Sequence, residues 1–187
     1  MTPWLQNYFQ AIGEKYELSG PYLEVGCGGG PLAILAGRYF RQHADRFAIN
    51  VVRAKPARGI AFRKGNSNDM RGLFADDSFR TVLSNAVLEH DRYFWRSVGE
   101  IKRVLAPGGV LVIGAPAFVP RRLTGLSVLG LPETVPATIT YDVHARPDYW
   151  RFSRQAFEEV ICEGLELLEL RVLGKIPRVV AVAKKPQ

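Results

Sequence analysis

The chain has 187 residues, of which 47% are hydrophobic, and this length and composition suit one domain that spans residues 1–187. No uninterrupted run approaches the roughly 20 apolar residues of a membrane helix, and the first residues have neither the basic start nor the apolar core of a signal peptide, so we expect a soluble, cytoplasmic protein with no membrane partner. The two cysteines, Cys27 and Cys162, have no metal-ligand spacing and form no disulfide framework, so we expect no metal site and two reduced thiols.

Apolar residues recur along the chain either at helical spacing or in short strand-like runs. We expect an N-terminal helix that caps the domain within residues 1–16, and further helices at 31–40, 93–105 and 153–163, the last capped by Ser153. Strand-like runs occupy 22–25, 47–52, 60–63, 81–85, 110–115, 165–173 and 178–184. The last two runs are joined by a short turn and predict an antiparallel hairpin. The alternation before them predicts a parallel sheet with helices on both faces.

The turn after the first predicted strand is the most informative stretch, Glu24-Val-Gly-Cys-Gly-Gly-Gly-Pro31. Pro31 suits the first position of the following helix, because the missing N–H costs nothing there. A dinucleotide-binding fingerprint needs a glycine at this position, where the helix receives a pyrophosphate, so Pro31 disfavours that class of site. A turn without any ligand is the remaining alternative, although three consecutive glycines cost more backbone entropy than a purely structural turn usually needs.

The same turn resembles motif I of the class I S-adenosylmethionine-dependent methyltransferases, whose cofactor carries an amino-acid tail and no phosphate. Residues 76–90 and 100–113 resemble the later motifs of the type 11 group, so the resemblance covers about residues 21–116. It implies an α/β fold, namely a Rossmann-like, doubly wound, mostly parallel seven-stranded sheet in the order 3-2-1-4-5-7-6 with an antiparallel C-terminal hairpin. It also implies an enzyme that moves a methyl group from S-adenosylmethionine to an oxygen or nitrogen of a small molecule, leaving S-adenosylhomocysteine.

The resemblance implies a cofactor site beyond the C-terminal ends of the strands, where open parallel sheets bind ligands. Glu24 would lie beneath the glycine loop and either order it or reach the ammonium of the cofactor through water, and the loop backbone would face the methionine tail. Asp69 would accept a hydrogen bond from the adenine amino group and Met70 would lie against the ring, unless residues 66–69 are simply a polar turn. The expected cofactor-binding residues are Glu24, Gly26, Cys27, Gly28, Gly29, Gly30, Asn50, Asn68, Asp69, Met70, Asn85, Ala86 and Val87. The last three would line the side that faces the sulfonium, and we expect Cys27 to be a small loop residue and not a nucleophile.

One position departs from the family pattern. Members usually end the second strand with an acid that accepts hydrogen bonds from both ribose hydroxyls, whereas this chain has Asn50. Losing a charge-assisted hydrogen bond costs on the order of 1 to 2 kcal/mol, or about five- to thirtyfold in affinity. The segment 52–59 is also too short, and too rich in proline and glycine, for the usual crossover helix, so we expect a loop. Both departures keep open a degenerate member that binds the cofactor weakly or not at all and acts as a binding or regulatory module.

Residues 117–150 form an apolar insert that is broken by prolines and glycines. Such a segment suits a lid over the acceptor and equally suits a dimer contact, so both a monomer and a homodimer stay open. Because the sulfonium already activates the methyl group, the transfer depends mainly on geometry, and no catalytic residue is assigned. Candidates for a general base are His144, Tyr141, Tyr149 and His90, of which His90 is favoured as a pocket wall. Four arginines are compatible with an anionic acceptor: Arg121, Arg122, Arg146 and Arg151.

Positive charge is concentrated between residues 38 and 64, where eight basic residues face one acid and account for a charge equal to the +7 of the whole chain. A basic patch can hold phosphates. However, its aromatic residues fall at positions that we expect to be buried, and scattered arginines usually form a solvated face. Nucleic-acid binding is therefore not favoured, and an RNA methyltransferase is a weaker alternative.

Overall fold

The computed structural model describes residues 2–122, 130, 134–139, 147–173 and 177–187. The strands of its large sheet are β1 (Tyr22–Val25), β2 (Arg46–Asn50), β3 (Ile60–Lys64), β4 (Phe79–Asn85), β5 (Leu105–Pro116), β8 (Glu166–Leu173) and β9 (Arg178–Lys184). A separate pair is formed by β6 (Val119–Arg122) and β7 (Thr134–Ala137). The helical elements are α1 (Pro3–Lys15), η1 (Ile34–Ala36), α2 (Arg38–Arg41), η2 (Leu88–His90), α3 (Phe94–Val104), α4 (Arg154–Ala156) and η5 (Phe157–Ile161).

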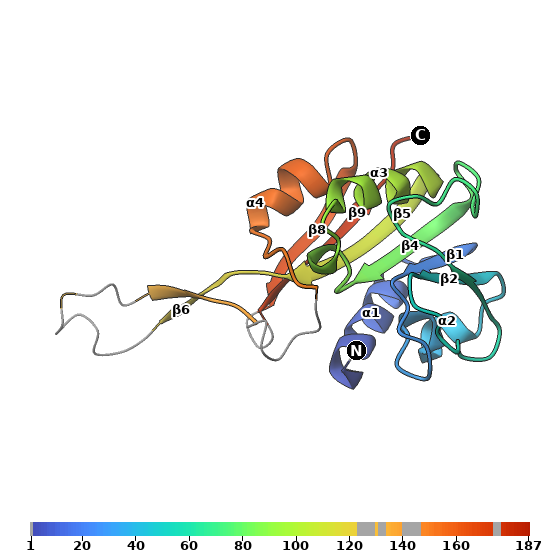
Figure 1. Cartoon of the computed structure of the whole chain (residues 1–187), viewed down its shortest axis with the longest axis horizontal. Coiled ribbons are helices and arrows are strands. Elements are labelled where there is room, and N and C mark those ends of the chain that lie inside the picture. The colour runs from blue at the N-terminus through green and yellow to red at the C-terminus, as the bar shows by residue number, and fades with distance from the viewer. Residues whose placement is uncertain (1, 123–129, 131–133, 140–146, 174–176) are drawn as a thin grey trace.

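The large sheet has the order β3-β2-β1-β4-β5-β9-β8 (Figure 1). Because the separate pair takes the labels β6 and β7, this order is the predicted 3-2-1-4-5-7-6. The first five strands pair in parallel, whereas β9 is antiparallel to both β5 and β8. The predicted Rossmann-like α/β fold with a C-terminal antiparallel hairpin is confirmed.

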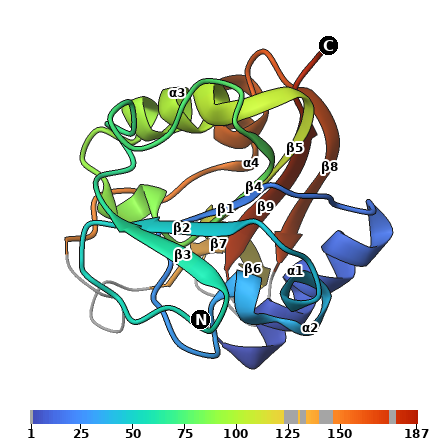
Figure 2. The same cartoon turned by 90° about the vertical axis from the view of Figure 1, so that its right-hand side faces the viewer.

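Helices cover both faces of the sheet (Figure 2). On one face, α1 begins at the Thr2 cap and buries Leu5, Phe9 and Ile12 in a cluster with Tyr22 of β1. On the other face, α3 and η5 bury their apolar residues in a second cluster with the strands. The burial follows the three- and four-residue spacing of apolar positions that predicted these helices.

The prediction of a helix at 31–40 is wrong, because the segment forms only the short elements η1 and α2. Gly37 separates them with an extended backbone, at φ −66° and ψ 160°. The amide of Gln10 lies against this point, accepting from the N–H of Tyr39 at 2.7 Å and donating to the carbonyl of Ile34 at 3.3 Å. Hydrogen bonds with the side chains of Gln10 and Glu24 replace the backbone hydrogen bonds that a continuous helix would make.

Other elements agree more closely with the sequence. Residues 51–59 form a loop, as the prolines and glycine there predicted. The hydroxyl of Ser153 accepts a hydrogen bond from the N–H of Ala156 at 3.0 Å, which confirms the predicted cap of the last helix. That helix continues from α4 into η5 with π-type turns.

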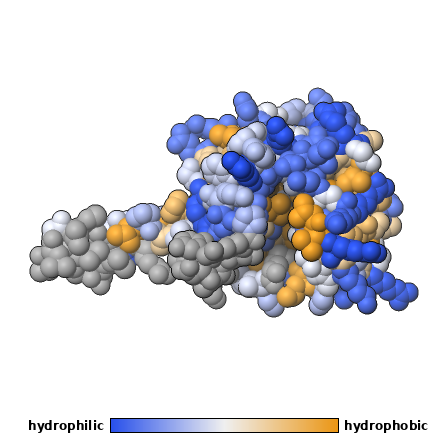
Figure 3. Space-filling view, viewed as in Figure 1, coloured by the Kyte–Doolittle hydropathy of each residue, from blue (hydrophilic) through white to orange (hydrophobic). Residues whose placement is uncertain are grey.

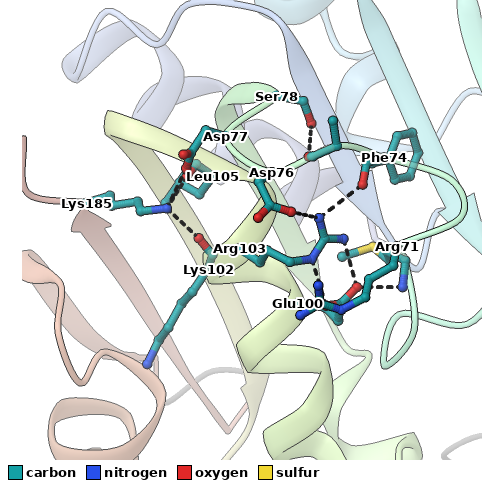
Figure 4. A network of polar contacts seen from close by, with 12 residues as sticks. Arg71, Phe74, Asp76, Asp77, Ser78, Glu100, Lys102, Arg103, Leu105 and Lys185 are labelled. Carbon is teal, nitrogen blue, oxygen red and sulfur yellow. Dashed lines mark hydrogen bonds and ion pairs between the residues drawn. The ribbon is translucent and has the colours of Figure 1, made fainter.

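A network of charged groups holds the segment after β3 against α3 (Figure 4). The guanidinium of Arg103 donates to the carboxylate of Glu100, to Asp76 and to the carbonyl of Phe74. The carboxylate of Glu100 also accepts from the N–H of Met70 at 2.6 Å. The contacts with α3 therefore fix the path of the segment after β3.

The insert leaves and re-enters the body at one point. Ala117 and Phe152 form a β-bridge, and the N–H of Phe152 donates to the carbonyl of Pro116 at 3.0 Å. Between these residues β6 and β7 extend away from the body (Figure 1). None of the helices in the described residues is long and apolar enough to cross a bilayer.

Candidate functional site

Two neighbouring cavities lie at the C-terminal ends of β1 to β4. The nucleoside-side cavity, of about 400 Å³, is lined by Gly26, Ile49, Asn50, Val51, Val52, Gly65, Asn66, Ser67, Ala86, Val87, His90, Asp91 and Pro147. The loop cavity, of about 310 Å³, is lined by Glu24, Gly26, Gly28, Gly29, Leu32, Ala33, Ile34, Asn85 and Ala86. Because Gly26 and Ala86 line both, one elongated molecule that passes between them can occupy the two cavities together. A space-filling view shows apolar residues beside a recess between hydrophilic surfaces (Figure 3).

The glycine loop is fixed by backbone hydrogen bonds to the neighbouring strand and loop. The N–H of Gly26 donates to the carbonyl of Ile49 at 2.8 Å, and that of Gly30 donates to the carbonyl of Lys55 at 3.0 Å. The backbone of Gly29 has φ +76°, and a Cβ there would lie 2.7 Å from the carbonyl oxygen of Lys55. The loop therefore needs glycine at this position. The predicted residues Gly26, Gly28 and Gly29 line the cavities, whereas Cys27 and Gly30 do not.

Glu24 holds the segment that follows the loop. Its two carboxylate oxygens accept hydrogen bonds from the N–H groups of Ile34 and Leu35, both at 3.0 Å. Burial raises the pKa of this carboxyl, while the two backbone donors act in the opposite direction. Glu24 thus orders the loop, as predicted, and also borders the loop cavity.

Asn50 ties the glycine loop to the end of β2. Its side-chain N–H donates to the carbonyl of Cys27 at 2.9 Å, and its Oδ1 accepts from the N–H of Val52 at 3.3 Å. An aspartate has no side-chain donor and cannot make the first bond. The amide therefore has a structural use at the position where the family usually carries an acid.

The end of β3 contributes different residues from those predicted. Asn66 and Ser67 line the nucleoside-side cavity, while Asn68, Asp69 and Met70 do not. Met70 is fully buried in the core, and Asn68 donates to the carboxylate of Asp91 at 3.3 Å. The expectation that Asp69 and Met70 face the adenine therefore needs correction. The chain turns immediately after Gly65, and the network around Glu100 draws the next residues toward α3.

The end of β4 forms the wall between the two cavities. Asn85 lines the loop cavity, Val87 lines the nucleoside-side cavity and Ala86 lines both. Ala86 has φ +57°, an uncommon conformation for a residue with a side chain, and its N–H donates to the carbonyl of Gly114 at 2.9 Å. The side chain of Arg178 at the start of β9 donates to Oδ1 of Asn85. All three predicted residues are therefore at the cavities.

Of the four candidate bases, His90 and Tyr149 are in the described part of the chain, whereas Tyr141 and His144 lie outside it. His90 lines the nucleoside-side cavity, and its Nδ1 contacts the carbonyl of Pro147. Its Nε2 lies 3.8 Å from the carboxylate of Glu89. Tyr149 is 52% exposed and donates its N–H to the carbonyl of Glu89 at 2.7 Å.

Glu89 is fully buried beside this cavity. Burial raises the pKa of its carboxyl to about 7, the charges of His90 and Arg178 oppose that rise, and the charge of Asp148 adds to it. The neighbouring Asp148 is paired with Arg151. Arg151 therefore neutralises the buried carboxylate of Asp148. The sequence had suggested only a role for Arg151 toward an anionic acceptor.

Cys27 is fully buried, and burial together with the charge of Glu24 raises the pKa of its thiol to about 12. The thiol is therefore protonated near neutral pH and inert as a nucleophile. This agrees with the prediction of a small loop residue.

The sequence reading missed Asn66, Ser67 and Arg178. Gly65, directly after a predicted strand, was a signal for the first two, because such a glycine often begins the turn at a strand end. Arg178 is 93 residues from Asn85, and no local pattern connects them.

Residues 23–113 match the family model described as a methyltransferase domain. The matched segment contains the glycine loop, Asn50, the end of β3 and the end of β4. The match, the strand order and the position of the cavities agree with the resemblance to the class I S-adenosylmethionine-dependent methyltransferases. A comparison with the curated proteins found no match.

Solved structures with the same fold are only distantly similar in sequence. The cyclase SpnF has a TM-score of 0.67 and 16% identity, with 97% of this chain and 80% of that chain covered. The 1,6-didemethyltoxoflavin-N1-methyltransferase of Burkholderia thailandensis, solved with its substrate and S-adenosylhomocysteine, has a TM-score of 0.66 and 17% identity, covering 97% and 78% of the two chains. The N-methyltransferase NodS of Bradyrhizobium japonicum WM9, also solved with S-adenosylhomocysteine, has a TM-score of 0.60 and 15% identity, covering 97% and 86%. At these identities the likeness establishes the fold.

Proposed function

We propose that this methyltransferase-family protein transfers a methyl group from S-adenosylmethionine to an oxygen or nitrogen of a small-molecule acceptor. The observation that carries the proposal is the pair of cavities that meet at Gly26 and Ala86. A nucleoside joined through sulfur to an amino acid has the same two-part form.

The residues at each cavity suit the corresponding part of the cofactor. The nucleoside-side cavity offers the apolar side chains of Val51 and Val87 and the polar side chains of Asn66 and Ser67, which suits a purine. The loop cavity offers Glu24 and Asn85, which suit the charged amino-acid tail. The sulfur would lie near the residues that the cavities share.

S-adenosylmethionine supplies an electrophilic methyl group on a sulfonium, so the chain has to bind the cofactor and the acceptor, orient them and exclude water. Ala86 is held by its bond to Gly114 and by the turn after β4, which fixes the wall between the cavities. His90 is the described histidine that lines the nucleoside-side cavity, with its Nδ1 at the carbonyl of Pro147 and its Nε2 3.8 Å from the carboxylate of Glu89. Because a carbonyl only accepts, the contact with Pro147 favours a proton on Nδ1.

The matched family model supports methyl transfer, and the neighbour solved with bound 1,6-didemethyltoxoflavin supports a small-molecule acceptor. The insert between Ala117 and Phe152 is the segment that we assign to acceptor recognition, because it leaves and re-enters the body at the site edge of β5.

Titration calorimetry with S-adenosylmethionine and S-adenosylhomocysteine tests the proposal. We expect saturable binding of both ligands with one site per chain. Absence of heat and of thermal stabilisation at millimolar ligand would refute a cofactor-dependent enzyme and favour the degenerate binding module. A functional assay with radiolabelled methyl donor and pooled small-molecule acceptors then identifies the acceptor class.

One observation favours the degenerate module as a second candidate. Asn50 is already bonded to the glycine loop and to Val52, so it has less capacity to hold ribose hydroxyls than a free carboxylate. The cyclase SpnF shows that the fold also occurs in a protein named for another reaction. The calorimetry separates the candidates, since a module without a cofactor site binds neither nucleoside.

A further inference from the structure

Asn85 and Arg178 form a contact that brings the C-terminal hairpin to the cofactor cavities. Because β9 runs antiparallel to β5, its first residue pairs with Pro116 at the same edge of the sheet as the end of β4. Arg178 is only 5% exposed, its Nη1 donates to Oδ1 of Asn85, and its Nε has no hydrogen-bond partner in the described structure. Gly114 leaves room for this contact, since a Cβ there would lie 3.1 Å from Oδ1 of Asn85.

The buried guanidinium fixes which way the amide of Asn85 points. A guanidinium has only donors, so the amide group nearest to it must be the oxygen. A flipped amide would place donor against donor in a buried setting, which is strongly unfavourable. Asn85 lines the loop cavity, and its Nδ2 makes no hydrogen bond to any described residue. The side chain therefore offers N–H donors to a ligand in that cavity.

The loop cavity then has the polarity of a binding site for an α-amino acid. Glu24, on β1, lines this cavity, and each of its carboxylate oxygens has a second lone pair beside its bond from Ile34 or Leu35, which suits an ammonium. Asn85 extends the β1–β4 register by one position beyond Val25 and Ser84, and so ends the strand beside the one that carries Glu24. Its N–H groups suit a carboxylate. An amide donor discriminates against a ligand that lacks an acceptor at this point, because the buried donor is then left without its partner.

We propose that Asn85, held by Arg178, binds the carboxylate of the cofactor's amino-acid tail. Asn85 makes the contact, and Arg178 is a positioning residue that sets the orientation of the amide. The inference rests on the proposed function, since it assigns a group of the same ligand.

Two ligands test the assignment: S-adenosylhomocysteine and 5′-methylthioadenosine, which has the nucleoside and sulfur but no amino-acid tail. The Asn85→Asp variant keeps the shape and the acceptor for Arg178 but replaces the N–H donors by a second carboxylate oxygen. We expect its affinity for S-adenosylhomocysteine to fall about tenfold or more, and its affinity for 5′-methylthioadenosine to change by less than about threefold. Asn7→Asp on the exposed face of α1 makes the same chemical change away from the cavities and controls for net charge.

Arg178→Met tests the positioning role, with the exposed Arg41→Met as its matched control. We expect a selective loss of S-adenosylhomocysteine affinity of about three- to tenfold with 5′-methylthioadenosine unchanged, and partial recovery in Arg178→Lys, whose ammonium can still donate to Oδ1. Thermal unfolding reports whether each variant is folded.

The outcomes distinguish a failure of the Asn85 assignment from a failure of the proposed function. Equal losses for both ligands, or unchanged S-adenosylhomocysteine affinity in Asn85→Asp, would overturn the assignment while leaving the proposed function in place. Wild-type protein that binds neither ligand would refute the proposed function and the inference with it.

Discussion

A Cβ atom on Gly26 would lie 2.0 Å from Cγ2 of Val87, so the glycine loop and the segment after β4 approach each other at a distance that only glycine permits. Gly26 also has φ +80°, a conformation that residues with a side chain rarely adopt. The junction of the two cavities depends on both constraints. Val87 cannot simply rotate away without entering the nucleoside-side cavity that it lines.

We therefore expect Gly26→Ala to lower the free energy of unfolding by about 1 to 3 kcal/mol and to weaken S-adenosylhomocysteine binding at least tenfold. Urea unfolding and calorimetry measure the two effects. Gly99→Ala is the control, because a Cβ on this exposed residue of α3 meets nothing within 4 Å. It should raise stability by about 0.5 to 1 kcal/mol. A Gly26→Ala protein with normal stability and binding would show that the loop adapts.

Replacing Asn50 by the family's usual acid should not improve the site. Asn50→Asp places a carboxylate where the amide now donates to the carbonyl of Cys27 at 2.9 Å. Two acceptors then face each other, and we expect a loss of about 1 to 3 kcal/mol in stability without tighter S-adenosylhomocysteine binding. Thermal denaturation and calorimetry, with Asn7→Asp as the charge control, measure both. Tenfold tighter binding at unchanged stability would mean that the carboxylate turns toward the ribose.

Arg103 is expected to matter more for stability than any exposed arginine. Its side chain is 10% exposed, and that of its partner Glu100 is 11% exposed. Arg103→Met removes the close cation from this partly buried carboxylate and leaves it only the exposed Arg71 at 3.8 Å, so we expect a loss of about 2 to 4 kcal/mol in urea unfolding. The matched change Arg154→Met removes a pair with Glu158 whose side chains are 61% and 36% exposed, so its effect should stay below about 0.5 kcal/mol. Similar effects for both variants would contradict the role assigned to the network.

The raised pKa of Glu89 predicts a pH dependence with a definite sign. Its pKa is about 7 in the folded protein, against an ordinary value of 4.5. Between these values the folded state binds more protons than the unfolded state, so stability should fall as pH rises from 4.5 to 7, by at most about 3 kcal/mol. Glu89→Gln should flatten this part of the profile, measured by urea unfolding at several pH values. An identical slope in the variant would assign the effect to other groups.

The strands could be predicted because each has a local signature, whereas their order was implied by the family resemblance and is compatible with the alternation of strands and helices. The glycine loop was also predictable, since the positive φ of Gly26 and Gly29 leaves a mark in the sequence. Both features depend on short-range chemistry. Glu24, Asn85 and Val87, which were named from the same stretches of sequence, line the cavities.

The errors arise where distant residues decide the outcome. Gln10 interrupts the helix expected after the loop by bonding to Ile34 and Tyr39. Glu100 and Arg103 draw Met70 toward α3, so the cavity wall at the end of β3 is formed by residues two to three positions earlier than expected. None of these contacts has a periodic signal, and only the folded chain brings the partners together.

The bridge between Ala117 and Phe152 has an implication for divergence within the superfamily. A chain excursion whose two ends are joined at the body can be lengthened, shortened or exchanged while the sheet keeps its hydrogen bonds. Under the proposed function, exchanging this excursion between homologues should change acceptor preference while the sheet stays the same.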